Sequence, residues 1–261
     1  MMALLTEPMQ VDYRTVRTSS GIIGETDSWH TSCDWKWQIP MKYFTFGIKA
    51  GHTETKRNTL YSQSISHIDI TNNAMARDTR SRSTGCSINA TKNFPSIFTK
   101  ISTDAGYNFG NGEQAVNSDI IKVRSNSYNV HGNVSVSPLS WLELGYDIRY
   151  GRSHTIYSDK SNKLTSLSHS GAIHVFPISA LDISVNYDHV RHQIAVGRYK
   201  QAALFNASAQ YKLKRLIFRL ELDNLLNKRH YAYTVFDGIN TYSYDYSLCG
   251  RTTMLIVRFQ I

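Results

Sequence analysis

The ten histidines are the first residues to consider for chemistry, because imidazole is the commonest metal ligand in proteins. His189-Val190-Arg191-His192 places two of them close together, and Asp188 adds a carboxylate. On a strand, residues three apart face opposite sides, so only a turn could direct both rings at one ion. We expect this segment to be a solvated outer loop. We therefore predict no metal site, no haem and no other cofactor.

Acidic residues raise the alternative of a barrel-shaped enzyme. Asp147, Asp182, Asp188 and Glu143 are candidates for acid–base work. Catalysis needs such groups within hydrogen-bond reach of a second group, and no spacing in the sequence singles out a pair. Acidic residues also line water-filled pores. We predict no catalytic residue and no enzymatic activity.

The distribution of charge argues against a nucleic-acid site, and the cysteines argue against a disulfide framework or a zinc site. The formal charge is +9, but the cations are scattered, and the nearest cluster (Lys212, Lys214 and Arg215) falls at a predicted tight turn. We therefore expect no nucleic-acid partner. The three cysteines, Cys33, Cys86 and Cys249, are odd in number and lack a CxxC spacing, which supports neither a disulfide framework nor a zinc site.

Composition and prolines predict the elements that must position these residues. The chain has 16 Tyr and only 5 Pro, and it has no run of about 18 apolar residues that could form a membrane-spanning helix. Four prolines, at 40, 95, 138 and 177, lie in short breaks between alternating runs, and residues 212–215 form a fifth break. Each interval has room for two strands of about ten residues and a polar loop.

The runs between the breaks alternate with a period of two, which predicts half-buried strands. Leu142, Leu144, Tyr146, Ile148 and Tyr150 share one face, and the same pattern recurs in residues 128–136, 181–188, 205–213 and 216–223. His131 and His174 fall on polar faces, and His169 falls on an apolar one. The polar residues that we expect to face a water-filled lumen are Glu143, Asp147, Arg149, Asn206, Gln210, Arg219 and Glu221.

Alternation alone does not say whether the apolar face meets lipid or a dry core, as in a soluble β-sandwich. Strands of nine or more residues favour lipid, because soluble strands average about 5–6. So do short turns at one end opposite long polar loops, predicted at Asn111–Val123, Arg152–Leu164 and Tyr233–Tyr246. Aromatic residues recur near both strand ends, as in interfacial girdles.

The strand count fits a barrel or part of one. Ten strands follow from Met41 to the C-terminus, Trp29–Gln38 gives an eleventh, and Val11–Ile23 is a candidate twelfth. We predict an all-β, antiparallel, up-and-down transmembrane β-barrel of about 10–12 strands. Closure is needed in a membrane, because an open sheet edge leaves backbone groups unpaired in hydrocarbon.

The C-terminal strand resembles the assembly signal of outer-membrane proteins. Leu255, Val257, Phe259 and Ile261 lie on one face of a strand that ends at the last residue. Such strands are recognised by the barrel-assembly machinery, which we expect to be a partner. Outer-membrane proteins usually end on an aromatic residue, whereas this chain ends on Ile261 with Phe259 two residues before.

A second motif resembles a segment of TonB-dependent receptors. Phe218–Tyr231 contains Asn-Leu-Leu-Asn-Lys, similar to the family's NLLNKxYY segment, and a Gly-Arg precedes the last strand, as in that family. The matching residues are Asn224, Leu225, Leu226, Asn227, Tyr231, Gly250 and Arg251. From the residues alone, this segment suits a strand that leaves the lipid zone, with a structural role. The whole chain also looks similar to outer-membrane β-barrel proteins of Bacteroidetes.

The resemblance implies a 22-stranded barrel with an N-terminal plug and a TonB box in the Gram-negative outer membrane. Neither plug nor signal peptide is visible, since MMALLTEPMQ lacks a basic and then an apolar region. We therefore expect residues 1–261 to be the C-terminal portion of such a barrel and, if produced alone, to aggregate through its edges.

The implied function is TonB-dependent uptake of a scarce or bulky nutrient. The implied partners are outer-membrane lipid, TonB acting through the plug, and a nutrient whose identity the sequence does not give. A self-contained 12-stranded porin-like channel and a surface adhesin are the alternatives.

Overall fold

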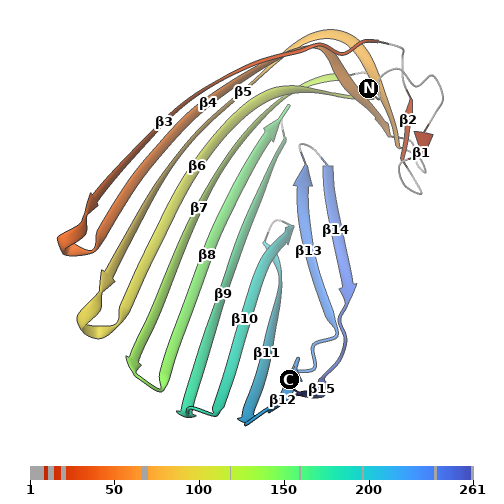
Figure 1. The fold of residues 1–261 in the computed structure, drawn as a ribbon. Coiled ribbons are helices and arrows are strands. Elements are labelled where there is room, and N and C mark those ends of the chain that lie inside the picture. Colours follow the sequence, from red (N-terminus) through yellow and green to blue (C-terminus); the bar gives the residue numbers. More distant parts are fainter. Residues whose placement is uncertain are drawn as a thin grey trace.

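The computed structural model describes residues 9–10, 15–18, 22–65, 70–117, 119–158, 160–195, 197–237 and 240–259. Almost all of them lie in strands, and no helix of this part is long and apolar enough to cross a membrane (Figure 1). The strands are β1 (Met9–Gln10), β2 (Thr15–Thr18), β3 (Thr26–Ile39), β4 (Phe44–Ile65), β5 (Ile70–Phe94), β6 (Thr99–Val116), β7 (Asp119–Leu139), β8 (Leu142–Tyr157), β9 (Lys160–Ile178), β10 (Leu181–Ala195), β11 (Arg198–Leu213), β12 (Leu216–Asp223), β13 (His230–Asp237), β14 (Asn240–Ser247) and β15 (Thr252–Phe259).

One large antiparallel sheet contains β3 to β12 and β15, each strand pairing with the next along the chain. This meander confirms the predicted all-β, up-and-down fold class. Only short segments pair in parallel, such as β2 with the far end of β5. β13 and β14 form a separate two-stranded sheet.

All five predicted short turns are confirmed. The first two are single 3-10 turns, Pro40–Lys42 and Pro95–Ile97, and each begins with the proline and ends on a left-handed residue, Tyr43 or Phe98. Two-residue turns at 140–141, 179–180 and 214–215 join the later strands. Pro40 and Pro95 suit the first two turns because the fixed φ of proline fits a turn. Pro138 and Pro177 lie instead in β7 and β9, one residue before each strand ends.

The predicted strand count is also confirmed from residue 26 onward. Ten strands of the large sheet follow Met41, and β3 includes the eleventh strand predicted at Trp29–Gln38. The candidate twelfth, Val11–Ile23, lies partly outside the described residues. Of that range the structure shows only the four-residue β2 as strand.

The predicted long outer loops are wrong. Residues 111–116 and 119–123 continue β6 and β7 in full register, and residues 152–157 and 160–164 do the same for β8 and β9. The third predicted loop, Tyr233–Tyr246, is instead the β13–β14 hairpin. Polar strands beyond the apolar zone lack the hydrophobic alternation by which strands are recognised, and sequence reasoning therefore took them for loops.

Register keeps the apolar side chains on one face across the whole sheet. A single row crosses six strands as Ile101, Val134, Tyr146, Gly171, Tyr187 and Phe205. These side chains do not form a dry core, because Leu60, Ala115 and Ala202 are the only buried hydrophobic residues in the described part. Ile148, Ile173 and Leu255 on this face are exposed. The apolar face therefore has no protein layer over it.

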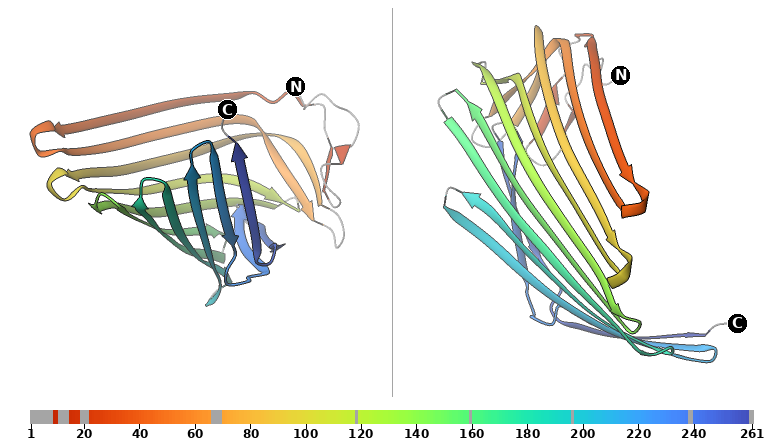
Figure 2. Two further views of the ribbon diagram at one scale, coloured as in Figure 1. Left: turned by 60° about the horizontal axis from the view of Figure 1, so that its bottom comes forward. Right: turned by 90° about the vertical axis from the view of Figure 1, so that its left-hand side faces the viewer.

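The sheet is curved and open (Figure 2). Within the described residues, β3 pairs only with β4, and β15 pairs only with β12. Each of these strands therefore has one unpaired edge. The structure shows part of a barrel wall and not a closed barrel.

Candidate functional site

The seven residues predicted to face the lumen lie on the face opposite the apolar one. Register places most of them beside Ser, Asn, Asp and His residues of the neighbouring strands, whereas on β15 Ile256 faces Arg219 and Met254 faces Glu221. Glu143 faces His174, Asp147 faces Asn133 and Ser170, Arg149 faces His131 and Ser168, Asn206 faces Asn186, Gln210 faces Asp182 and Arg219, and Glu221 faces Ser208. We call this surface the polar face. It offers hydroxyls, amides and a few charges to water.

The polar face also carries the hollows of the sheet. One hollow is lined by side chains from β7 to β11, including Asn133, Asp147, Ser170, Asn186 and Asn206. Two of the predicted lumen residues, Asp147 and Asn206, therefore border the same depression. Another hollow lies between β3 and β7 and is lined by residues such as His30, Gly51, Gly85 and Asp104. Each is open and polar, which suits a passage more than a tight ligand pocket.

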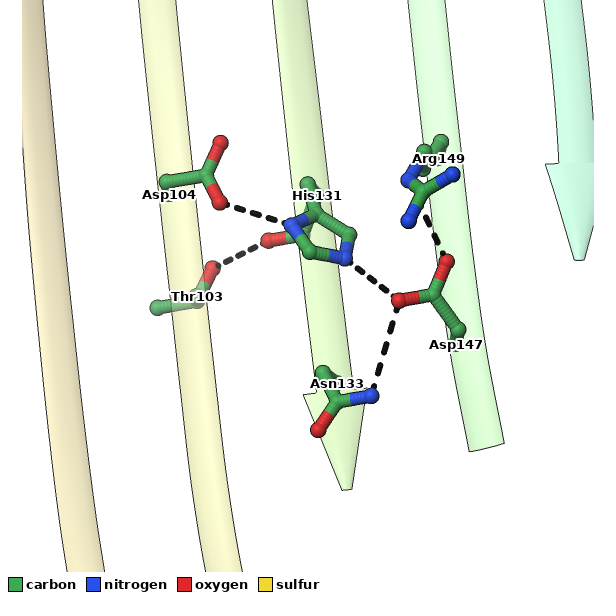
Figure 3. A network of polar contacts seen from close by, with 6 residues as sticks. All are labelled: Thr103, Asp104, His131, Asn133, Asp147 and Arg149. Atoms are coloured by element: carbon green, nitrogen blue, oxygen red, sulfur yellow. Dashed lines mark hydrogen bonds and ion pairs between the residues drawn. The ribbon is translucent and has the colours of Figure 1, made fainter. Parts of the chain in front are cut away.

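A hydrogen-bonded network crosses three strands of this face (Figure 3). The imidazole of His131 on β7 lies between two carboxylates, with Nδ1 2.7 Å from Asp104 Oδ1 on β6 and Nε2 2.5 Å from Asp147 Oδ2 on β8. Arg149 Nε lies 3.3 Å from the other oxygen of Asp147, and Asn133 Nδ2 donates to Asp147 at 3.5 Å. Sequence reasoning placed His131 on a polar face but missed this network, because its members come from three strands.

The network binds charged groups to one another. Both ring nitrogens of His131 and both oxygens of Asp147 have partners. A general base or metal ligand needs a free lone pair directed at its substrate or ion, and this arrangement leaves none on the ring. The network therefore has a structural role: it joins β6, β7 and β8 through polar side chains, and we call it the clamp. Within the described residues no cluster of three metal-ligating side chains is found.

Asparagine side chains lie over glycines on the same face. A Cβ at Gly85 would stand 2.4 Å from Asn108 Oδ1, and one at Gly106 would stand 2.8 Å from Asn129 Oδ1. Each pair faces across neighbouring strands. Because glycine has no side chain, the asparagine amides lie close against the backbone of the sheet at these positions. This keeps the surface shallow while it remains rich in hydrogen-bonding groups.

The β13–β14 hairpin carries a ladder of tyrosines. Alternation places Tyr231 and Tyr233 on the same face as Tyr242, Tyr244 and Tyr246 of the partner strand. The rings of Tyr233 and Tyr244 stack with centroids 5.0 Å apart, and those of Tyr233 and Tyr246 are 5.9 Å apart. Tyr242, Tyr244 and Tyr246 are exposed. A row of rings of this kind offers flat apolar area together with hydroxyls.

Two contacts attach this hairpin to the polar face of the large sheet. The hydroxyl of Tyr231 lies 3.2 Å from His192 Nε2 on β10, and Asp245 pairs with Lys200 of β11 at 3.6 Å. His192 is the twelfth residue of β10, beyond the about ten residues that a strand needs to cross a bilayer. Burial lowers the pKa of His192 and raises the pKa of Tyr231, because it penalises the charged form of each group.

The residues of the receptor-like motif form a clasp between the end of β12 and the start of β15. Asn224 is buried, with 7% of its surface exposed, and has a left-handed φ of 52°. Its Nδ2 donates to the carbonyls of Lys228 at 2.7 Å and Cys249 at 2.8 Å, and its Oδ1 accepts from the Lys228 amide at 2.8 Å. The side chain thus bonds two loops that are far apart in sequence.

Other motif residues complete the clasp. The Arg251 guanidinium donates twice to the carbonyl of Leu225, at 2.7 and 3.2 Å, and the Arg251 amide donates to Asn227 Oδ1 at 3.2 Å. Gly250 lies so close that a Cβ there would be 3.0 Å from Asn227 Oδ1. Tyr231 is outside the clasp and contacts His192, while Leu226 is exposed.

The remaining sequence predictions have mixed outcomes. The expected loop at His189-Val190-Arg191-His192 is wrong, because all four residues lie in β10. His189 therefore joins the apolar face, where its ring centroid is 4.8 Å from that of His169 and the two rings are tilted, while His192 lies on the polar face, so His189 and His192 cannot bind one ion. Leu255, Val257 and Phe259 share the apolar face of β15. Ile261 lies outside the described residues.

Comparison with known proteins adds little detail. No protein-family model matches the sequence, and no curated protein does. Among solved structures, the ferric yersiniabactin uptake receptor FyuA from Yersinia pestis is similar, with a TM-score of 0.48 and 10% sequence identity. The alignment covers 96% of this chain and 45% of that one. The chain thus spans less than half the length of this neighbour.

Proposed function

We propose that this chain is part of the wall of an outer-membrane β-barrel that takes up a scarce or bulky nutrient with energy supplied through TonB. The observation that carries the proposal is the division of the large sheet into two faces. One face is apolar, continuous across the strands and uncovered by protein, and the other is lined by hydroxyls, amides and charged groups. Such a sheet is stable where lipid covers one side and water the other.

The open edges support the view that the chain is the C-terminal portion of a larger barrel. Unpaired backbone groups in hydrocarbon cost several kcal/mol each, so β3 and β15 need partners in a membrane. Additional strands would supply them. The receptor-like motif and the final strand fit the C-terminal position of this wall.

In this proposal the barrel transports and does not catalyse. The polar face lets a hydrated solute pass, and the tyrosine ladder of β13–β14 offers stacking surface where a ligand enters. A plug domain, supplied elsewhere in the protein, would block the lumen until TonB moves it. The clamp around His131 and the clasp around Asn224 hold neighbouring strands in fixed positions while the plug moves.

Uptake in cells tests the proposal. The gene that contains this sequence is deleted, and cells are grown with a siderophore, a vitamin, a glycan or a peptide as the limiting source. Loss of growth on one source, reproduced by deletion of TonB and restored by the gene, is the expected result. Uptake that continues without TonB would contradict the proposal and favour a porin-like channel.

A further inference from the structure

The apolar face ends in arginines at the edge remote from the short turns. On β8 the apolar series ends at Tyr150 and Arg152 follows at the next outward position; on β10, Arg191 follows His189 in the same way. On β7, Arg124 lies beyond Tyr128 and Asn126 on the same face, and on β5, Arg82 and Arg80 lie beyond Thr84. We call this set the cationic belt, and it comprises Arg80, Arg82, Arg124, Arg152 and Arg191.

Register places the belt on the apolar face and not on the polar one. Arg82 faces Asn111, which in turn faces Arg124, so these two arginines share one row. Arg152 faces Tyr128, whose ring is 6.0 Å from that of Tyr150. All five arginines are exposed. The belt therefore borders whatever covers the apolar face.

Local contacts hold the guanidinium groups while leaving the belt a net positive charge. The carboxylate of Glu54, 4% exposed, binds Arg80 at 2.5 Å and Arg82 at 3.1 Å. The other partners are uncharged: Arg152 donates to the Tyr128 hydroxyl at 3.3 Å. Arg191 lies 4.3 Å from the centre of the Tyr199 ring.

Other carboxylates at this level do not cancel the belt. Glu113 is engaged by Arg77 at 3.5 Å, and Asp27 faces Lys56 in the register of β3 and β4. Asp78 lies two residues beyond Arg80 on β5, so the five arginines have two carboxylates among them, Glu54 and Asp78, and a positive excess remains along the outer edge of the apolar face. A small soluble anion would contact only the arginines and would make no use of the apolar surface beside them. A ligand that uses both the charge and the adjoining apolar surface must itself be amphiphilic.

We propose that the cationic belt binds the phosphate groups of anionic lipids in the leaflet around the barrel. This inference rests on the membrane placement given under the proposed function. Guanidinium groups donate paired hydrogen bonds to phosphate, and their planar shape suits it better than an ammonium. Basic residues next to a membrane attract anionic headgroups, while the acyl chains of the same lipid cover the apolar face. The tyrosines between the two zones suit the headgroup boundary.

Lipid binding by the full-length protein, purified from the outer membrane in detergent, tests this inference. Native mass spectrometry measures its affinity for a glycolipid with two phosphates, for the same lipid without phosphates, and for inorganic phosphate. The test variant is Arg124→Gln with Arg152→Gln. The control, Lys49→Gln with Lys100→Gln, removes two positive charges from the polar face.

Each arginine is expected to contribute about fivefold, so the test variant should bind the phosphorylated lipid about 25-fold more weakly. The control should bind it as the wild type does, and inorganic phosphate alone should bind far more weakly than the lipid. An unchanged affinity in the test variant would overturn the inference. An equal loss in the control, equal binding of the dephosphorylated lipid, or equally tight binding of inorganic phosphate would also overturn it. Failure of the proposed function is distinguishable, because it would appear as uptake that continues without TonB, whatever the lipid affinities of the variants.

Discussion

Replacing Asn224 with alanine should destabilise the protein strongly, because its side chain makes three hydrogen bonds that no other residue replaces. Each such bond contributes about 1 kcal/mol net, and the carbonyls of Lys228 and Cys249 would lose a donor. Alanine also tolerates the left-handed φ of 52° less well than asparagine, at about 1 kcal/mol. We expect Asn224→Ala to lower the free energy of unfolding by about 4 kcal/mol.

Urea unfolding of the full-length protein in lipid vesicles, followed by tryptophan fluorescence, measures this change. Lys228→Ala is the matched control, because Lys228 takes part in the clasp only through main-chain atoms. The control should lie within about 0.5 kcal/mol of the wild type. A loss below about 1 kcal/mol for Asn224→Ala would refute the assignment of the motif as a clasp.

Three further predictions concern the two faces and the hairpin. Ile148→Arg on the apolar face should cost about 2–4 kcal/mol in lipid vesicles, and Ser168→Arg on the polar face much less; equal costs would contradict the face assignment. Gly85→Ala should cost about 1–3 kcal/mol in the same assay, and Asn108→Ala should restore the loss if contact with that amide is the cause. Because burial under the docked hairpin lowers the pKa of His192 on β10, the undocked state binds more protons at this residue, so docking should weaken as the pH falls below the ordinary histidine value of about 6.5. The protection factors of the β13 amides against hydrogen exchange, taken relative to the intrinsic rate at each pH, should then fall between pH 8 and pH 5, and protection that does not change with pH would contradict this.

Strands and turns were predictable where a short stretch of sequence carries its own pattern. Residues 142–150 alternate between apolar and polar, as expected of a strand whose two faces differ in polarity, and the structure confirms a strand there. The prolines at 40 and 95 mark turns because a ladder cannot use them. Both signals come from short stretches of the chain, so they can be read from the sequence alone.

The outer hairpins and the polar network were not predictable in the same way. Residues 111–116 and 119–123 show no apolar alternation although they are paired, so the pattern by which strands are recognised is missing there. The tyrosine ladder did alternate, at 231, 233, 242, 244 and 246, and this was the signal that could have identified β13 and β14. The clamp around His131 depends on the register of three strands, which no local pattern reveals.

The central claim is that the apolar face contacts lipid. Nitroxide labels placed one at a time along β8, from Leu142 to Arg152, in the full-length protein with its three cysteines replaced by serine, test it most directly. Labels at positions such as Leu144 and Ile148 should be relaxed mainly by oxygen, which concentrates in the bilayer. Those at Gly145 and Arg149 should be relaxed mainly by a water-soluble nickel chelate. The reverse pattern, or no period of two, would contradict the account.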